Sequence, residues 1–343
     1  MIFIKIRHKV DTMKSLDRNQ MFSVFQKRRH RFLGDGEKLV DLKIHLVRNF
    51  RNKFRNMSLK YEVITDQEKK TIRAKINGCK DAPQREWQIL NYLRKSGLGK
   101  RVPLPLDYFK PLNIFFYSEA PGVSFEELLS QKRINEHLKF VGLIAGCLNR
   151  IHRISKKPHF LPLKTIREEK EERRHWFFLI RKCAPDFYPA FSRLLKELWR
   201  FSPRRFLGRS KGKTSIVHGD FHWGNVVKVG ENDFKIMDFG AAFLGDPLED
   251  VGGFLAQNDS MFRYYAPSFI REGRRIREVF LKSYFVSPLS PLLKSRLLYF
   301  EIQKMLEMAA ILGFIEPNEK NKAMGIKRLL IEAEQKLREL MSL

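Results

Sequence analysis

The sequence TSIVHGDFHWGNVVKVGENDFKIMDFGAAFLGDP, residues 214–247, contains the polar residues on which the fold prediction depends. Asp220 follows a short apolar run, and Asn225 comes five positions later. Asp238 ends a second apolar run further along the chain. Three oxygen-bearing side chains at this spacing are the candidates for a functional site.

The residues between Asn225 and Asp238 predict a β-hairpin. Residues 226–229 are rich in β-branched valine, residues 230–233 have the composition of a turn, and residues 234–237 form an apolar return. The hairpin would bring Asn225, just before its first strand, next to Asp238 at the end of its second. Because Mg²⁺ prefers carboxylate, amide and phosphate oxygens, the pair is predicted to hold a magnesium ion.

The order of these residues is that of a kinase catalytic loop followed by a metal-binding aspartate. In that order the first aspartate accepts the proton of the attacking hydroxyl group, which predicts Asp220 as the catalytic base. The loop reads His218-Gly219-Asp220, with glycine where protein kinases usually have arginine. The alternative is a polar turn on an ordinary hairpin. The HGD motif at 218–220 and the DFG motif at 238–240 occur in the kinase order, which argues against this alternative.

This variant resembles the aminoglycoside phosphotransferase and choline kinase superfamily, whose pattern is HGD, four residues, Asn, a hydrophobic pair and Asp. The later segment GDPLED is similar to the same family. The resemblance implies Asp220 as the base, Asn225 and Asp238 as metal ligands, and His218 and Asp250 as residues that brace the loop. It also implies ATP and Mg²⁺ as cofactors. The implied fold is α+β and protein-kinase-like, with a small β-rich N-lobe and a larger, mainly helical C-lobe.

The lobes are predicted from the positions of the motifs. Residues 1–40, whose basic clusters fit neither a helix nor a strand pattern, form a basic N-terminal extension. Residues 41–121 form the nucleotide-binding N-lobe, and residues 122–343 form the C-lobe with the catalytic loop 218–225 and the metal aspartate. A helical cap at about 156–213 is expected to face the substrate, as insertions at this place do in the family.

The predicted N-lobe contains a hairpin that presents a lysine. Residues 59–65 pair with residues 71–76 across a polar turn, and Lys75 lies in the second strand. The loop that covers the nucleotide phosphates is expected between Leu42 and Lys60, a stretch with six basic residues and no glycine. Because this departs from a glycine-rich phosphate loop, basic side chains or backbone amides would have to hold the phosphates there.

Two further segments complete the nucleotide site that the resemblance implies. A helix that begins near residue 81 carries Glu86, and the segment from Glu119 to Pro121 follows the next strand. On the resemblance, Glu86 holds Lys75 toward the α- and β-phosphates, and Glu119 and Pro121 belong to the hinge that contacts adenine. A solvated surface pair and an ordinary turn are the respective alternatives.

The net charge of +28 predicts attraction to polyanions. Residues 156–213 alone contain 17 Lys and Arg against 6 Asp and Glu, which favours an anionic acceptor over a polycation. Contact with an anionic membrane surface and binding to nucleic acid stay open on charge alone. So does a solvated basic face that is unrelated to the substrate.

The chain is predicted to be cytoplasmic, with a peripheral position at the inner membrane face as the alternative. Cys79, Cys147 and Cys183 lie far apart, without the spacing of a zinc site or a disulfide framework. The N-terminus has charges scattered through its apolar residues and therefore lacks the core of a signal peptide.

Together these features predict an ATP-dependent phosphotransferase that acts on a hydroxyl group of a small molecule or a sugar-lipid head group. A kinase for lipopolysaccharide core sugars, which shares the fold, is the alternative within the same class. A catalytically inactive protein that binds nucleotide or a polyanion is the alternative of another class. The glycine-free stretch favours the inactive protein, and the joint presence of Asp220, Asn225 and Asp238 opposes it.

Overall fold

The computed structural model describes residues 17–50, 56–76, 81–201 and 214–343, which divide into two compact units. The first unit holds Met1–Val123, Pro158–Leu161 and Val226–Ala242, and the second holds Ser124–Lys157, Pro162–Asn225 and Phe243–Leu343. The hairpin that leads to Asp238, which the sequence analysis assigned to the C-lobe, therefore clusters with the first unit.

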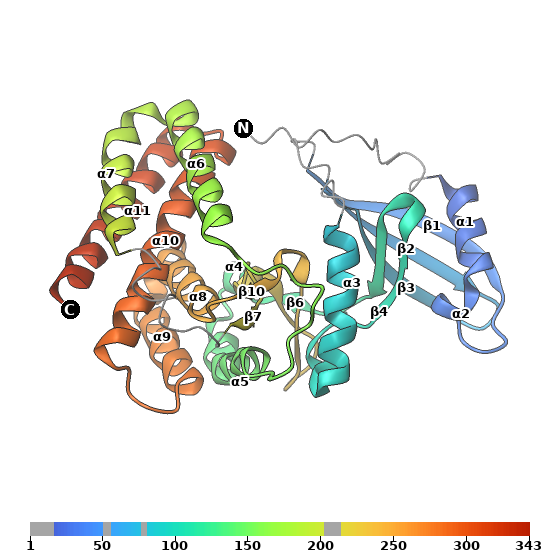
Figure 1. Cartoon of the computed structure of the whole chain (residues 1–343). Coiled ribbons are helices and arrows are strands. Elements are labelled where there is room, and N and C mark those ends of the chain that lie inside the picture. The colour runs from blue at the N-terminus through green and yellow to red at the C-terminus, as the bar shows by residue number, and fades with distance from the viewer. Residues whose placement is uncertain (1–16, 51–55, 77–80, 202–213) are drawn as a thin grey trace. The chain divides into compact units, whose positions relative to one another are not determined.

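The first unit is built on a five-stranded antiparallel sheet with the strand order β1-β2-β3-β5-β4 (Figure 1). The strands are β1 Leu39–Phe50, β2 Asn56–Thr65, β3 Lys69–Ile76, β4 Pro105–Phe109 and β5 Ile114–Ser118. Pairing of β2 with β3 confirms the predicted hairpin. Along β3, Ile72, Ala74 and Ile76 are buried on one face of the sheet, so the alternation of a strand places Lys75 on the other.

Two N-terminal helices, α1 (Arg18–Lys27) and α2 (Arg29–Phe32), cover one face of this sheet. The Asp17 carboxylate accepts a hydrogen bond from the Gln20 amide at 2.8 Å and so caps the start of α1. Met21, Val24 and Phe25 are buried in the same core as the strands. The sequence predicts no element here, because the apolar face of α1 is only three residues wide and has basic residues on either side.

Helix α3 (Ala82–Leu93) lies on the opposite face of the sheet from α1 (Figure 1). Pro83 stands in its first turn, and Glu86, Ile89 and Leu90 are among its buried residues, as the predicted helix requires. Residues 51–55, which separate β1 from β2 in the sequence, lie outside the described residues, and so does the centre of the expected phosphate loop.

The hairpin that leads to Asp238 is also present in the first unit. Strands β8 (Val226–Lys228) and β9 (Phe234–Ile236) pair antiparallel, with Val226 opposite Ile236, which confirms the predicted hairpin. The short strand β6 (Val123–Ser124) lies where the chain passes from the first unit to the second.

The second unit is mainly helical, with one two-stranded sheet formed by β7 (Ser215–Val217) and β10 (Phe243–Gly245). Its helices are α4 Phe125–Ser130, α5 Ile134–His152, α6 Ile166–Cys183, α7 Tyr188–Arg200, α8 Leu248–Ser260, α9 Ile270–Tyr284, α10 Pro291–Ile315 and α11 Glu319–Ser342. Helix α10 is central, because it contacts α6, α7, α8 and α11 and supplies much of the apolar core.

Helices α6 and α7 belong to the predicted cap, of which residues 202–213 are outside the described residues. Among the helices that the structure describes, none combines the length and the apolar composition needed to cross a membrane.

Candidate active site

The predicted catalytic loop begins directly after β7, whose residues Ile216 and Val217 are fully buried. Gly219 has a φ of +83°, in the left-handed region that side chains disfavour. This backbone conformation favours glycine at this position of the motif. Two aromatic side chains anchor the loop, because Phe221 and Trp223 contact Phe254 of α8 at ring-centroid distances of 5.6 and 4.9 Å.

Asp250, in the first turn of α8, holds the loop through its backbone. Its Oδ2 accepts a hydrogen bond from the His218 amide at 2.6 Å, and its Oδ1 accepts one from the Gly219 amide at 2.9 Å. The side chain is almost fully buried at a helix N-terminus, where the helix dipole favours a negative charge. The structure thus brings together the two residues that were predicted to brace the loop.

His152, the last residue of α5, is a third member of this network. Its Nε2 lies 3.0 Å from Asp250 Oδ2, and its Nδ1 lies 2.6 Å from the Tyr284 hydroxyl. Burial raises the pKa of Tyr284, so its hydroxyl stays protonated. Because a carboxylate oxygen can only accept, the imidazole Nε2 carries a proton, which it donates to Asp250.

The carboxylate of Asp220 is about half exposed and has two cationic or donor neighbours. His222 Nε2 lies 3.6 Å from Oδ2, and Lys304 Nζ of α10 lies 3.8 Å from Oδ1. His222 Nδ1 accepts a hydrogen bond from the Gly224 amide at 3.0 Å, which leaves the proton on Nε2, facing Asp220. Partial burial alone would raise the pKa of Asp220, but His222 and Lys304 together lower it below its ordinary value. Asp220 is therefore ionised at neutral pH and can accept a proton.

Asn225 ends the 3₁₀ turn Trp223–Asn225 that closes the loop. Its Nδ2 donates a hydrogen bond to the Asp220 carbonyl at 2.8 Å. This contact fixes the side-chain amide and leaves Oδ1 as the atom suited to a metal. Asn225 belongs to the second unit and Asp238 to the first, so their joint metal site stays a prediction.

In the first unit, Lys75 forms two ion pairs. Its Nζ lies 2.9 Å from Glu86 Oε1 of α3 and 2.9 Å from Asp238 Oδ1. The structure thus brings Lys75 and Glu86 together, as predicted, and adds Asp238 to the pair. Asp238 has φ 62° and ψ 60°, a conformation that costs energy for any residue except glycine and that is concentrated at functional sites.

The three charges of this cluster change one another's ionisation. Burial alone would lower the pKa of Lys75, but the charges of Glu86 and Asp238 raise it above its ordinary value, so Lys75 stays charged. Burial raises the pKa of Glu86 to about 7 despite the nearby charge of Lys75. Lys75 is therefore a fixed cation of the kind that binds phosphate.

The segment predicted as the hinge follows β5. The Glu119 carboxylate accepts a hydrogen bond from Arg73 Nε at 2.9 Å, and Pro121 is exposed. The side chain of Glu119 is therefore engaged within the sheet, so any contact with adenine would be made by the backbone of this segment. That contact stays a prediction.

Among the described residues, no group of three or more His, Cys, Asp and Glu is placed to hold a metal ion. The predicted magnesium site does not require one, because an amide oxygen and a carboxylate would be completed by phosphate oxygens and water. The carboxylate of Asp238 is about half exposed, so water and phosphate oxygens could reach an ion bound to it. Asp238 therefore fits a partly hydrated magnesium ion.

A family model described as the phosphotransferase enzyme family matches residues 58–287. The chain belongs to this family. Every predicted site residue, from Lys75 to Asp250, lies within the matched range. The family predicted from the sequence is therefore confirmed.

Solved structures of the same fold extend over nearly the whole chain. Spectinomycin phosphotransferase in complex with ADP and spectinomycin is 14% identical, with a TM-score of 0.58, over 95% of this chain and 99% of that one. Choline kinase from Streptococcus pneumoniae is 15% identical, with a TM-score of 0.57, over 93% and 99%. An amicoumacin kinase in complex with AMP-PNP and Ca²⁺ is 14% identical, with a TM-score of 0.63, over 96% of each chain. No curated protein sequence matches this chain.

These similarities confirm the predicted fold class, α+β and protein-kinase-like. At such low identities they show the fold alone.

Proposed function

We propose that this protein transfers the γ-phosphoryl group of ATP to a hydroxyl group of a small molecule. The observation that carries this proposal is the state of Asp220. It is an ionised carboxylate at the edge of a pocket, on a loop that Asp250 fixes through two backbone amides. An acceptor hydroxyl that donates a hydrogen bond to this carboxylate is oriented for attack.

The proposed reaction has one chemical step. The acceptor oxygen forms a bond to the γ-phosphorus, and the bond between that phosphorus and the β–γ bridging oxygen breaks. ADP leaves with the electron pair of that bond, and the hydroxyl proton passes to Asp220. Magnesium bound by Asn225 and Asp238 would neutralise phosphate charge.

The remaining predicted residues would hold the nucleotide. Lys75, fixed by Glu86, would bind the α- and β-phosphates, and the segment from Glu119 to Pro121 would contact adenine. Nucleotides in the solved structures of spectinomycin phosphotransferase and amicoumacin kinase support this part of the proposal by analogy of fold.

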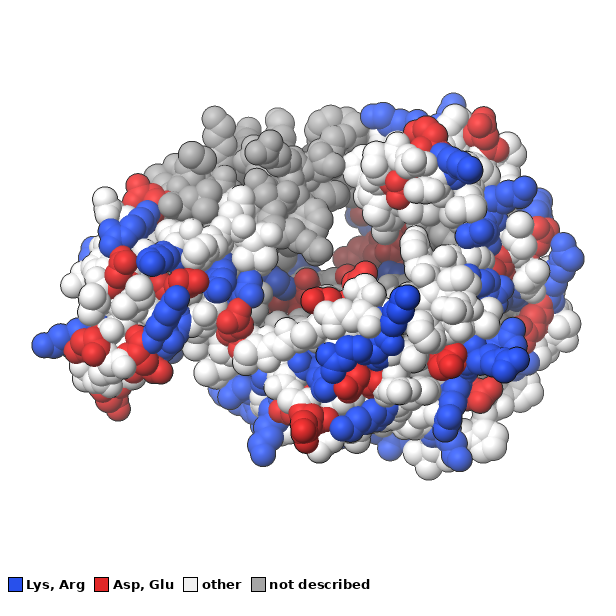
Figure 2. Space-filling model, turned by 180° about the vertical axis from the view of Figure 1, so that it is seen from behind, with Lys and Arg blue, Asp and Glu red and all other residues white. Residues whose placement is uncertain are grey.

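The sequence favoured an anionic acceptor from the charge of residues 156–213. Within the described part of that cap, several cations already have carboxylate partners, among them Lys164 with Glu172 at 3.0 Å and Arg193 with Glu334 at 2.9 Å. On the face drawn in Figure 2, basic side chains are interspersed with acidic ones rather than gathered into one patch. The prediction that the acceptor is an anionic small molecule or sugar-lipid head group therefore rests on net charge alone.

The proposal is tested by titrating ATP into the protein with and without Mg²⁺ and by following ADP formation with a panel of hydroxyl compounds. We expect ATP to bind more tightly with Mg²⁺, and Asp238→Ala to lose most of that difference. Failure to bind ATP under both conditions would contradict the proposed function. ATP binding that is indifferent to Mg²⁺ would contradict the assignment of Asn225 and Asp238.

A further inference from the structure

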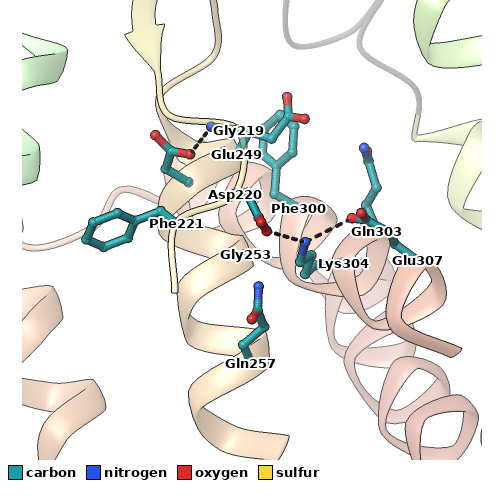
Figure 3. Close-up of a pocket in the computed structure, with 11 residues that line it drawn as sticks. Gly219, Asp220, Phe221, Glu249, Gly253, Gln257, Phe300, Gln303, Lys304 and Glu307 are labelled. Carbon is teal, nitrogen blue, oxygen red and sulfur yellow. Dashed lines mark hydrogen bonds and ion pairs between the residues drawn. The ribbon is translucent and has the colours of Figure 1, made fainter. Parts of the chain in front are cut away.

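Helix α8 lies beside the catalytic loop in the second unit. Glu249 near its start and Gln257 near its end both line the small pocket next to Asp220 (Figure 3). Asp250 holds the beginning of the loop through two backbone amides. Because both amides precede Asp220, the end of the loop, where Asn225 lies, needs a separate support.

Trp223 attaches the end of the loop to the core and is only 2% exposed. Its indole packs against Phe125 of α4, His137 of α5 and Phe254 of α8, at ring-centroid distances of 5.3, 4.8 and 4.9 Å. Such contacts are less directional than a hydrogen bond, so they bury the indole and leave the direction of its Nε1–H to a hydrogen-bond partner. The Nε1–H group can only donate, and burying it without an acceptor would cost free energy.

Asn258, in the last turn of α8, accepts that hydrogen bond. Its Oδ1 lies 3.2 Å from Trp223 Nε1, and the residue is fully buried. Its Nδ2 donates to the Gly273 carbonyl of α9 at 3.1 Å and to Asp259 Oδ1 at 3.4 Å. Because an indole can only donate and a carbonyl can only accept, these partners determine which way the amide is turned. A rotation of the amide would break its contacts with Trp223 and Gly273 together.

The packing of α8 against α9 holds Asn258 in place. At Gly273, a Cβ atom would come within 2.5 Å of Phe262 Cβ, so the backbone of α9 approaches its neighbour more closely than a side chain would allow. Asp259, the residue after Asn258, forms an ion pair with Arg277 of α9 at 2.8 Å. The acceptor for the indole therefore has two attachments to α9.

The position of Trp223 determines that of Asn225, because both belong to the 3₁₀ turn Trp223–Asn225. The backbone amide of Asn225 donates to the His222 carbonyl at 3.0 Å, and its Nδ2 donates to the Asp220 carbonyl at 2.8 Å. With both groups engaged, Asn225 Oδ1 moves only when the turn moves. A change in the hydrogen bond of the indole therefore reaches the predicted metal ligand.

We infer that Asn258 is a positioning residue for Asn225 and acts through Trp223. This inference rests on the proposed function. Asn258 is fully buried, so it touches neither the nucleotide nor the acceptor. By holding the indole, it keeps the 3₁₀ turn in the orientation in which Asn225 Oδ1 can bind a metal ion. Residues that orient metal ligands in this way typically contribute about 10–100-fold to metal affinity or activity.

The inference is tested by calorimetric titration of ATP with and without Mg²⁺. Asn258→Leu, which nearly keeps the volume of the side chain and removes its polar atoms, should reduce the gain in ATP affinity from Mg²⁺ by about 10-fold. ATP affinity without Mg²⁺ should stay the same. Trp223→Phe removes the donor and keeps an aromatic ring, so it should have a similar effect. The double variant should lose little more than either single variant, because both substitutions remove the same hydrogen bond.

A second measurement follows the indole itself. The Nε1–H resonance of Trp223 in a ¹H–¹⁵N spectrum is identified by its loss in Trp223→Phe. In Asn258→Leu this resonance should shift, and its proton should exchange with solvent faster, because its acceptor is gone. An unchanged resonance would overturn the inference, because Asn258 would then not hold the indole.

The matched control is Asn149→Leu. Asn149 belongs to the same unit and also donates to a carbonyl of α9, that of Tyr284 at 2.7 Å, but its side chain bonds to α9 rather than to the catalytic loop. The gain in ATP affinity from Mg²⁺ should therefore equal that of the parent protein. Equal losses in Asn149→Leu and Asn258→Leu would overturn the inference, because looser helix packing would then explain both.

Two further outcomes would overturn the inference and leave the proposed function intact. One is a full gain from Mg²⁺ in both Asn258→Leu and Trp223→Phe. The other is a loss in Trp223→Phe alone, which would mean that ring packing holds the turn. If Asn258→Leu does not fold, a full gain in Trp223→Phe is sufficient to overturn the inference. A parent protein that gains no ATP affinity from Mg²⁺ would instead contradict the assignment of Asn225 and Asp238 in the proposed function, and the inference would fail with it.

Discussion

The Lys75 cluster of the first unit and the Asp220 loop of the second fix their charges in different ways. In the first unit, Lys75, Glu86 and Asp238 compensate one another through their side chains. In the second, the buried charge of Asp250 is compensated largely by backbone amides. Protonation or substitution of one side chain in the Lys75 cluster therefore changes the charges that the others experience. Asp250, in contrast, holds the backbone of the loop, so the charge of Asp220 can change without disturbing the contacts that position it.

The largest expected effect is on Asp220, the group that this rigid loop presents. Asp220→Ala should lower kcat by at least about 10²-fold, because general-base groups contribute about 10²–10⁴-fold. ATP affinity and thermal stability should change little, since the side chain is about half exposed. Steady-state kinetics with calorimetric ATP titration measures both, and exposed Asp186→Ala is the control. Near-normal turnover would remove Asp220 from catalysis.

The second prediction tests whether the loop depends on Asp250. Asp250→Ala leaves the His218 and Gly219 amides and His152 without their acceptor, so the free energy of unfolding should fall by about 3 kcal/mol. Chemical denaturation measures it. His152→Phe, which removes one of the three donors, should cost less than half as much. Equal costs would mean that packing of α8, and not the hydrogen bonds, holds the loop.

The sequence predicts much of the catalytic loop because its residues are close together in the chain. Asp220, Asn225 and Asp238 are separated by one loop and one hairpin, so their spacing and the apolar pattern were enough to group them. Lys75 and Glu86 were paired correctly for a similar reason, since one strand and the next helix carry them.

Residues brought in by helix packing had no such signal. His152 and Lys304 lie on helices with apolar faces, far in sequence from Asp250 and Asp220, which they respectively contact, and neither belongs to a motif. Only the packing of α5 and α10 in the second unit places them. Helix α1 was missed for a different reason. Its signal, the Asp17 cap followed by Met21, Val24 and Phe25, was present but short.

The third prediction concerns the charge of Lys75. Lys75→Met should weaken ATP binding by about 10-fold or more, because hydrogen bonds to charged groups contribute about 1.5–3 kcal/mol. Isothermal titration measures it. Lys70 lies on the same strand and pairs with Glu37 at 2.7 Å, so Lys70→Met is the matched control. If both variants lose affinity equally, the effect is one of sheet stability rather than of phosphate binding.

The smallest expected effect is a pH dependence of ATP affinity that comes from the Lys75 cluster and not from the Asp220 loop. Glu86 has a pKa of about 7, so it is ionised and holds Lys75 above that pH and becomes neutral below it. The pKa of Asp220 is lowered, so its charge does not change between pH 6 and 8. ATP affinity should therefore decline by less than about 10-fold as the pH falls from 8 to 6, and Glu86→Gln should remove the part due to Glu86. Titration of the nucleotide itself is common to the parent protein and the Glu86→Gln variant, so it cancels in the ratio of their dissociation constants.

Lys75, Asp238 and Tyr117 also face Glu86, but Lys75 stays charged and the pKa of Tyr117 is raised. A ratio that is constant from pH 6 to 8 would show that the hold on Lys75 does not depend on the charge of Glu86, and the contrast between a titrating cluster and a backbone-fixed loop would then fail.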